Sequence, residues 1–119
     1  MNSPNNKLGL IVLGMHRSGT SLLSGLLNEL GLKLGSELIE ASKDNLKGHF
    51  ENKAIVLENE SFILGLGWDW LLPGKLPDNI DENLINSYRQ NIKTIVTREF
   101  INTDIFALKD PRLCRLIRV

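Results

Sequence analysis

The sequence has a single cysteine, so no disulfide can form within the chain, and a reducing compartment, the cytoplasm, is expected. We interpret this residue, Cys114, as a small buried apolar side chain rather than a reactive thiol. The chain also has no excess of positive or negative charge, because 14 basic residues balance 14 acidic ones. No run of lysine and arginine is present to attract a nucleic acid or an anionic membrane. Any anionic ligand must therefore be held by a local group of residues.

Long hydrophobic runs are also missing, since no apolar segment approaches the ~20 residues that a membrane span requires. Residues 1–7 are polar, lack the pattern of a signal peptide and are expected to form a disordered tail. The His, Asp and Glu residues show no metal-ligand spacing, so no metal is expected. With 119 residues, the chain is long enough for one domain at most, over residues 8–119.

The periodicity of apolar residues predicts an α/β fold with two buried parallel strands, residues 8–13 and 105–108. Helices are predicted over residues 20–30, 52–64, about 81–100 and from 113 onward. An inner stripe is expected on the third helix, formed by Leu84, Ile85, Tyr88, Ile92, Ile95, Val96 and Phe100. Two strands alone leave long unpaired edges. We therefore expect the N-terminal part of a larger domain or, alternatively, a short protein that completes its sheet as a homo-oligomer.

The loop after the first predicted strand carries the clearest motif, residues 14–21, which read GMHRSGTS. A strand, a loop with glycines five apart and a helix form the layout of a phosphate-binding loop, in which backbone N–H groups converge on an anion. The spacing fits the Walker pattern G-x-x-x-x-G-K-[ST], except that Thr20 stands in place of the lysine. The cation is then Arg17, inside the loop. The alternative is a tight turn in which Thr20 only caps the helix.

Three segments together resemble P-loop sulfotransferases. Residues 16–21, HRSGTS, resemble the family's 5′-phosphosulfate loop, and two further segments resemble its bacterial branch: residues 45–52, NLKGHFEN, and 108–113, LKDPRL. The resemblance implies the N-terminal part of a three-layer α/β/α P-loop nucleotide-binding domain. It also implies 3′-phosphoadenosine 5′-phosphosulfate as co-substrate, bound by Arg17, Ser18, Gly19, Thr20 and Ser21. The family's later Arg-to-Ser segment, which binds the 3′-phosphate, is not in this chain.

The same resemblance implies catalytic roles for three residues. Glu51 is the favoured general base, His49 is the alternative, and Glu37 and Glu40 are weaker candidates. Lys109 is implied to assist the leaving group. Each also has an ordinary interpretation: Glu51 as an acid at a helix N-terminus, His49 as a loop histidine and Lys109 as a solvated residue at a strand end.

The predicted function is transfer of a sulfuryl group to a hydroxyl or amine of a carbohydrate, lipid or small molecule. One alternative is a degenerate P-loop kinase or NTPase, in which Asp110 would hold Mg²⁺ after a buried strand. We interpret Asp110 instead as the ion-pair partner of Arg112 or Arg17. A non-catalytic anion-binding protein is the other alternative. Trp68 and Trp70 are expected either to line an acceptor pocket or to cover the core.

Overall fold

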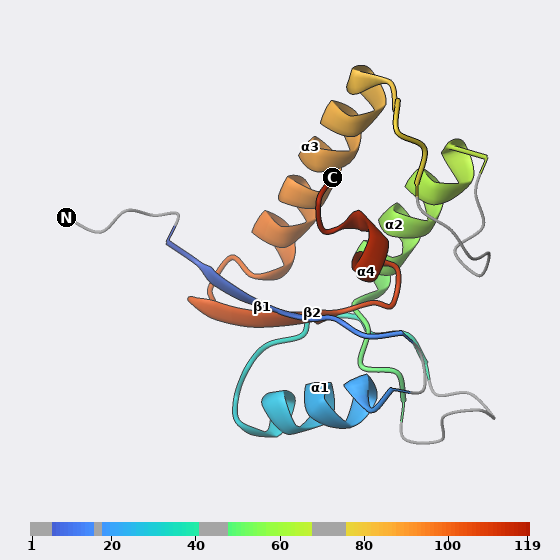
Figure 1. The fold of residues 1–119 in the computed structure, drawn as a ribbon. Helices are drawn as coiled ribbons and strands as arrows, with labels where there is room; N and C mark the ends of the chain where they lie inside the picture. The colour runs from blue at the N-terminus through green and yellow to red at the C-terminus, as the bar shows by residue number, and fades with distance from the viewer. Residues whose placement is uncertain (1–5, 16–17, 41–47, 68–75) are drawn as a thin grey trace.

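A computed structural model describes residues 6–15, 18–40, 48–67 and 76–119. Within them the α/β class is confirmed, and the elements follow in the order β1 (Leu8–Val12), α1 (Thr20–Glu29), α2 (Lys53–Gly65), α3 (Glu82–Glu99), β2 (Ile105–Lys109) and α4 (Leu113–Leu116). The strands β1 and β2 pair in parallel. Helix α1 covers one face of this sheet, and α2, α3 and α4 lie on the other (Figure 1).

Strand β2 has backbone neighbours on both of its edges. Its residues pair with β1 in a register that runs from Leu8 opposite Ile105 to Val12 opposite Lys109. On its other side Phe106 forms a bridge with Lys33, and the carbonyl of Lys33 accepts a hydrogen bond from the N–H of Ala107. The outer edge of β1 has no partner among the described residues.

The burial of the two strands follows from this arrangement. From Phe106 to Lys109, β2 is buried, so the predicted burial of the strand over 105–108 is confirmed except at Ile105, which is 38% exposed. In β1 only Val12 is buried, and Leu8 is 58% exposed. The prediction of burial on both faces is therefore wrong for β1, because an apolar run cannot tell a central strand from an edge strand.

Two helices begin directly after a residue whose side chain caps them. Asn52 caps α2 by accepting a hydrogen bond from the N–H of Ile55, and Asp81 caps α3 by accepting one from Asn83. The core lies between these helices and the sheet. One cluster gathers around Phe100 and Phe106, whose rings stack with centroids 4.3 Å apart, and a second gathers around Phe62 and Tyr88.

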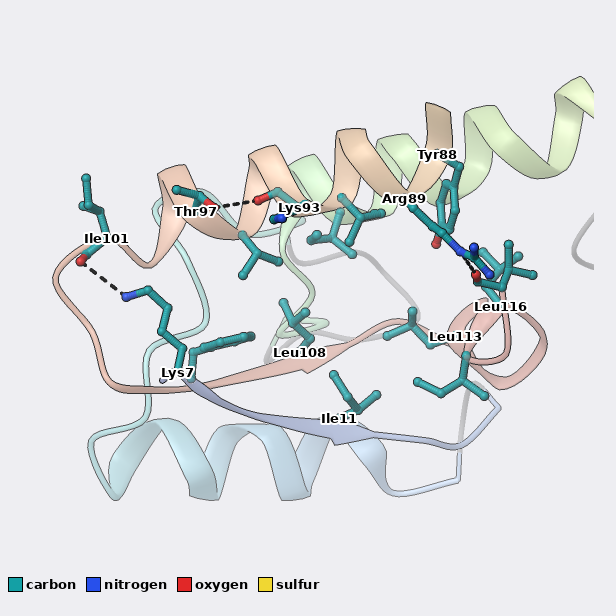
Figure 2. A pocket seen from close by; sticks show the side chains of 16 residues that line it. Lys7, Ile11, Tyr88, Arg89, Lys93, Thr97, Ile101, Leu108, Leu113 and Leu116 are labelled. Carbon is teal, nitrogen blue, oxygen red and sulfur yellow. Dashed lines mark hydrogen bonds between the residues drawn. The ribbon is translucent and has the colours of Figure 1, made fainter. Parts of the chain in front are cut away.

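An apolar groove of about 690 Å³ separates α3 from the sheet. Figure 2 shows Leu108 and Leu113 on one side of the groove and α3 on the other, with Lys7 at one end and Arg89 at the opposite end. Six of the seven residues of the predicted inner stripe belong to or pack against the core: Ile85, Tyr88, Ile92, Ile95, Val96 and Phe100. Leu84 does not, because it is 47% exposed near the start of α3.

The apolar side of α1 is largely exposed. Its leucines recur with helical spacing, but Leu22, Leu26 and Leu30 are more than half exposed. The buried positions of this helix are Thr20 and Ser24. Periodicity predicts a helix without showing which of its sides meets the sheet. The prediction that Cys114 is buried is wrong, because the residue is exposed on α4.

Candidate functional site

The loop between β1 and α1 is tight where it is described. A Cβ atom on Gly14 would lie 2.4 Å from Cγ2 of Thr20 and 2.7 Å from Oγ of Ser18, so a side chain has no room at this position. Gly19 has φ 87°, a left-handed conformation that glycine adopts at little cost. Gly14 is thus required for lack of space, and Gly19 is favoured by its left-handed backbone. His16 and the predicted anion-binding residue Arg17 lie outside the described residues.

The N-terminus of α1 has neither a side-chain cap nor an acidic side chain. The helix begins at Thr20 with no side-chain cap from Gly19 and no acidic residue in its first turn. The N–H groups of that turn point out of the positive end of the helix dipole. Of the predicted anion-binding residues, Ser18, Gly19, Thr20 and Ser21 all lie here.

The side chain of Lys109 meets this helix from the carboxyl end of β2. Its Nζ donates to Oε1 of Glu51 at 2.8 Å, to Oγ of Ser21 at 3.1 Å and to the carbonyl oxygen of His49 at 3.1 Å. The Lys109 side chain is only 3% exposed and that of Glu51 only 10%. One ammonium group therefore joins the three motif segments that the sequence analysis singled out, and Lys109 is not a solvated residue at a strand end.

The segment before α2 positions Glu51. Phe50 has φ 56°, a left-handed conformation that costs a non-glycine residue about 1–2 kcal/mol. Its ring lies so close to α1 that a Cβ on Gly25 would be 3.3 Å from Cζ. On the other side, the carbonyl of Glu51 accepts a hydrogen bond from the N–H of Ile39. Because these contacts hold the backbone on both sides, the Glu51 carboxylate is directed at Lys109.

The other candidate bases are placed differently. His49 contacts Lys109 through its backbone carbonyl. Glu37 lies at the surface, where its carboxylate pairs with Lys53 at 2.9 Å, and Glu40 is exposed. Of the four acidic or histidine candidates, Glu51 alone places its side chain on Lys109. Trp68 and Trp70, expected to line a pocket or cover the core, lie outside the described residues.

Asn52 connects this site to α3. Besides capping α2, its side-chain amide donates to the carbonyl of Leu34 at 3.0 Å and to Oε1 of Glu99 at 3.2 Å. The Ser36 hydroxyl donates to Oε2 of the same carboxylate. This hydrogen bond is the largest cause that lowers the pKa of Glu99 below its ordinary value, and the Asn52 amide lowers it further.

A buried polar network fixes the turn that follows Lys109. Oδ1 of Asp110 accepts from Arg112 at 2.9 Å, and Oδ2 accepts from the amide of Asn59 at 2.9 Å. The Tyr88 hydroxyl donates to Oδ1 of Asn59 at 2.6 Å. The predicted pairing of Asp110 with Arg112 is confirmed. Burial raises the pKa of Tyr88 well above its ordinary value, and the negative charge of Asp110 raises it further.

Sequence reasoning missed Asn59. A signal was present, because Asn59 lies four residues after Ile55 and three before Phe62, so it is a polar residue on the inward side of α2. A buried amide needs hydrogen-bond partners, which here come from α3 and from the turn after β2. The roles of Phe50 and Asn52 were missed as well.

Within the described ranges no group of three His, Cys, Asp or Glu residues could hold a metal ion. No described helix is both long enough and apolar enough to cross a bilayer. Comparisons of the chain with protein-family models, with curated proteins and with solved structures find no match. The contacts around Lys109 are therefore the basis on which a function is proposed.

Proposed function

We propose that this chain is a P-loop sulfotransferase that moves a sulfuryl group from 3′-phosphoadenosine 5′-phosphosulfate to a hydroxyl or amine. One observation carries the proposal: Nζ of Lys109 binds Glu51, Ser21 and the His49 carbonyl at the N-terminus of α1. A proton acceptor and a buried cation thus lie together at an anion-accepting helix end. This is the set of groups that sulfuryl transfer requires.

The donor's phosphosulfate occupies the helix end in this proposal. Backbone N–H groups of Ser18–Ser21 and the hydroxyls of Thr20 and Ser21 bind its oxygens. Arg17, which the sequence motif adds to this set, supplies a bidentate cation. Lys109 contacts the oxygen that bridges phosphorus and sulfur.

The acceptor oxygen attacks sulfur from the side opposite the phosphate. The bond from sulfur to the bridging oxygen breaks, and its electron pair leaves with adenosine 3′,5′-bisphosphate. Lys109 stabilises the charge that develops on this oxygen, and Glu51 takes the proton of the acceptor. Because the donor oxygens draw Lys109 away from Glu51, the donor prepares the carboxylate to act as a base.

The kinase alternative requires a free acidic group at the end of β2. Asp110 is fully buried, and each of its carboxylate oxygens already accepts a hydrogen bond from a protein side chain. Because the carboxylate has no exposed surface, it reaches Mg²⁺ only if this buried turn rearranges. No described contact therefore favours phosphoryl transfer.

Calorimetry tests the nucleotide site. Adenosine 3′,5′-bisphosphate should bind the protein with 1:1 stoichiometry without Mg²⁺, and ATP with Mg²⁺ should bind more weakly. Lys109→Met should weaken this binding about tenfold or more, because it removes a charged hydrogen-bond donor. Lys93→Met, which removes an exposed lysine of α3, is the matched control and should not change it.

Lys109→Met leaves Glu51 buried without its partner, so the double variant Lys109→Met/Glu51→Gln controls for misfolding. Transfer of labelled sulfate from the donor to a panel of alcohols then tests the reaction itself. Binding and transfer that require Mg²⁺ and ATP would contradict the proposal and favour a kinase. Bisphosphate binding without transfer to any acceptor would favour the non-catalytic alternative.

A further inference from the structure

A cavity of about 330 Å³ opens beside Glu51, along the side of α2 that carries Val56, Leu57 and Glu60. Its apolar wall includes Ile39, Val56 and Leu57, and its charged lining includes Glu51, Glu60 and Arg112. The volume is at the lower end of the range for small-molecule sites. A ligand in this cavity would touch the carboxylate that the proposed function uses as the base.

The charges that line the cavity do not cancel. Glu51 is paired with Lys109, and Arg112 is paired with Asp110. Glu60 is half-buried, and no described residue forms a hydrogen bond or an ion pair with its carboxylate. His49 also lines the cavity. Among the described residues of the lining, the Glu60 carboxylate is therefore the acidic group that no hydrogen bond or ion pair holds, which favours a cationic ligand and disfavours an anionic one.

Helix α2 sets the distance between Glu60 and Glu51, the proposed base. Glu60 lies four residues after Val56 and three after Leu57, so all three share one side of α2. Asn52, directly after Glu51, precedes Glu60 by about 12 Å along the helix axis. A bound molecule thus meets Glu51 at one end, an apolar wall in the middle and Glu60 at the other end.

We propose that this cavity binds the acceptor and that the acceptor is an amino alcohol. Its hydroxyl lies at Glu51, its short aliphatic body lies against Val56 and Leu57, and its ammonium group pairs with Glu60. This inference rests on the proposed function for the role of the hydroxyl. The binding of the cation rests on the cavity alone.

Ligand-detected NMR with adenosine 3′,5′-bisphosphate present tests the binding. Aminohexanol should bind more tightly than hexanol by about fivefold, the gain from one partly exposed ion pair, and hydroxyhexanoate should bind most weakly. Glu60→Gln should remove the preference for the amine. Glu58→Gln is the matched control, because it removes an equal charge from the same helix at a carboxylate that contacts Asn91.

Equal binding of aminohexanol and hexanol, tighter binding of hydroxyhexanoate, or no binding of aminohexanol at millimolar concentration would overturn the inference. So would an equal effect of Glu60→Gln and Glu58→Gln. Glu60-dependent binding of aminohexanol without sulfation would support the ligand class and contradict the sulfotransferase proposal. Sulfation of hexanol as efficient as that of aminohexanol would support the sulfotransferase proposal and contradict the inference that the acceptor is an amino alcohol.

Discussion

Lys109 and Glu51 form a buried ion pair whose members have different partners. Lys109 also binds Ser21 and the His49 carbonyl, whereas Glu51 lines the cavity beside α2. Removing one member of such a pair costs about 3–5 kcal/mol, because the other charge stays buried. Activity of variants at this pair must therefore be compared with their stability.

Glu51→Gln should lower turnover by roughly 10²–10⁴-fold in the sulfuryl-transfer assay, since the amide cannot accept the proton. Affinity for adenosine 3′,5′-bisphosphate, measured by calorimetry, should change little, because the carboxylate faces the acceptor. His49→Asn should cost less than about tenfold, since its backbone makes the described contact with Lys109. A large loss at His49 with a small loss at Glu51 would assign the base to His49.

Tyr88 gives the buried network of Asp110 and Asn59 an optical signal, because it is the only tyrosine in the chain. Burial raises its pKa above the unfolded value of about 10, so its contribution to stability is complete below pH ~10 and is lost as pH rises further. Tyrosinate absorbance should therefore rise together with the loss of circular dichroism. Ionisation near pH 10 in a protein that stays folded would contradict the buried position.

At the scale of elements, Glu99 links the end of α3 to the cap of α2 through Asn52. The hydrogen bond from Ser36 and then that from Asn52 lower the pKa of Glu99. Its stabilising contribution is present above the unfolded pKa of about 4.3 and is lost as pH falls through the folded value.

Glu99→Gln should therefore flatten the decrease in unfolding free energy between about pH 5 and pH 3, measured by urea denaturation. Glu29→Gln removes an exposed carboxylate from α1 and should leave this decrease unchanged. An equal effect of the two variants would mean that the hydrogen bonds of Glu99 do not hold the helices together.

Local residue patterns predict most elements of the fold. The helices predicted over residues 52–64 and about 81–100 are present, and three of the four residues before Lys109 have the predicted burial. The convergence of Ser21, Glu51 and Lys109 follows from motif order and from the rule that ligands bind at the carboxyl ends of parallel strands.

Other features depend on contacts between distant residues, which local patterns do not contain. The left-handed backbone of Phe50 exists because its ring packs against Gly25 of α1, and Asn59 is buried because two other elements supply its partners. Most residues of β1 are exposed because no described segment pairs with or covers the outer edge of this strand. None of these can be derived from the spacing of residues along the chain.

For the whole molecule, the outer edge of β1, which no described residue pairs with, is a surface suited to association. The strand has no charged residue and no proline, the features that usually protect an edge, and its side chains Leu8, Leu10 and Ile11 are partly exposed. The chain has zero net charge, so copies do not repel one another. We expect pairing of β1 with β1 of a second copy.

Leu10→Lys should shift the protein toward monomer at concentrations where the wild type associates, measured by light scattering after gel filtration. Leu84→Lys introduces the same charge at an exposed leucine of α3 and should not. A wild-type protein that is a monodisperse monomer with a sharp, cooperative melting transition would contradict this expectation.

The groups that meet at Lys109 come from distant parts of the chain, since Glu51 is 58 residues away and Ser21 is 88 residues away. They lie together only in the folded state, so a molecule that binds them shifts the folding equilibrium toward that state. At about 100 times its dissociation constant, such a molecule adds about 2.7 kcal/mol to the free energy of unfolding. A rise in melting temperature can therefore identify the natural ligand in a metabolite collection without any assay of a reaction.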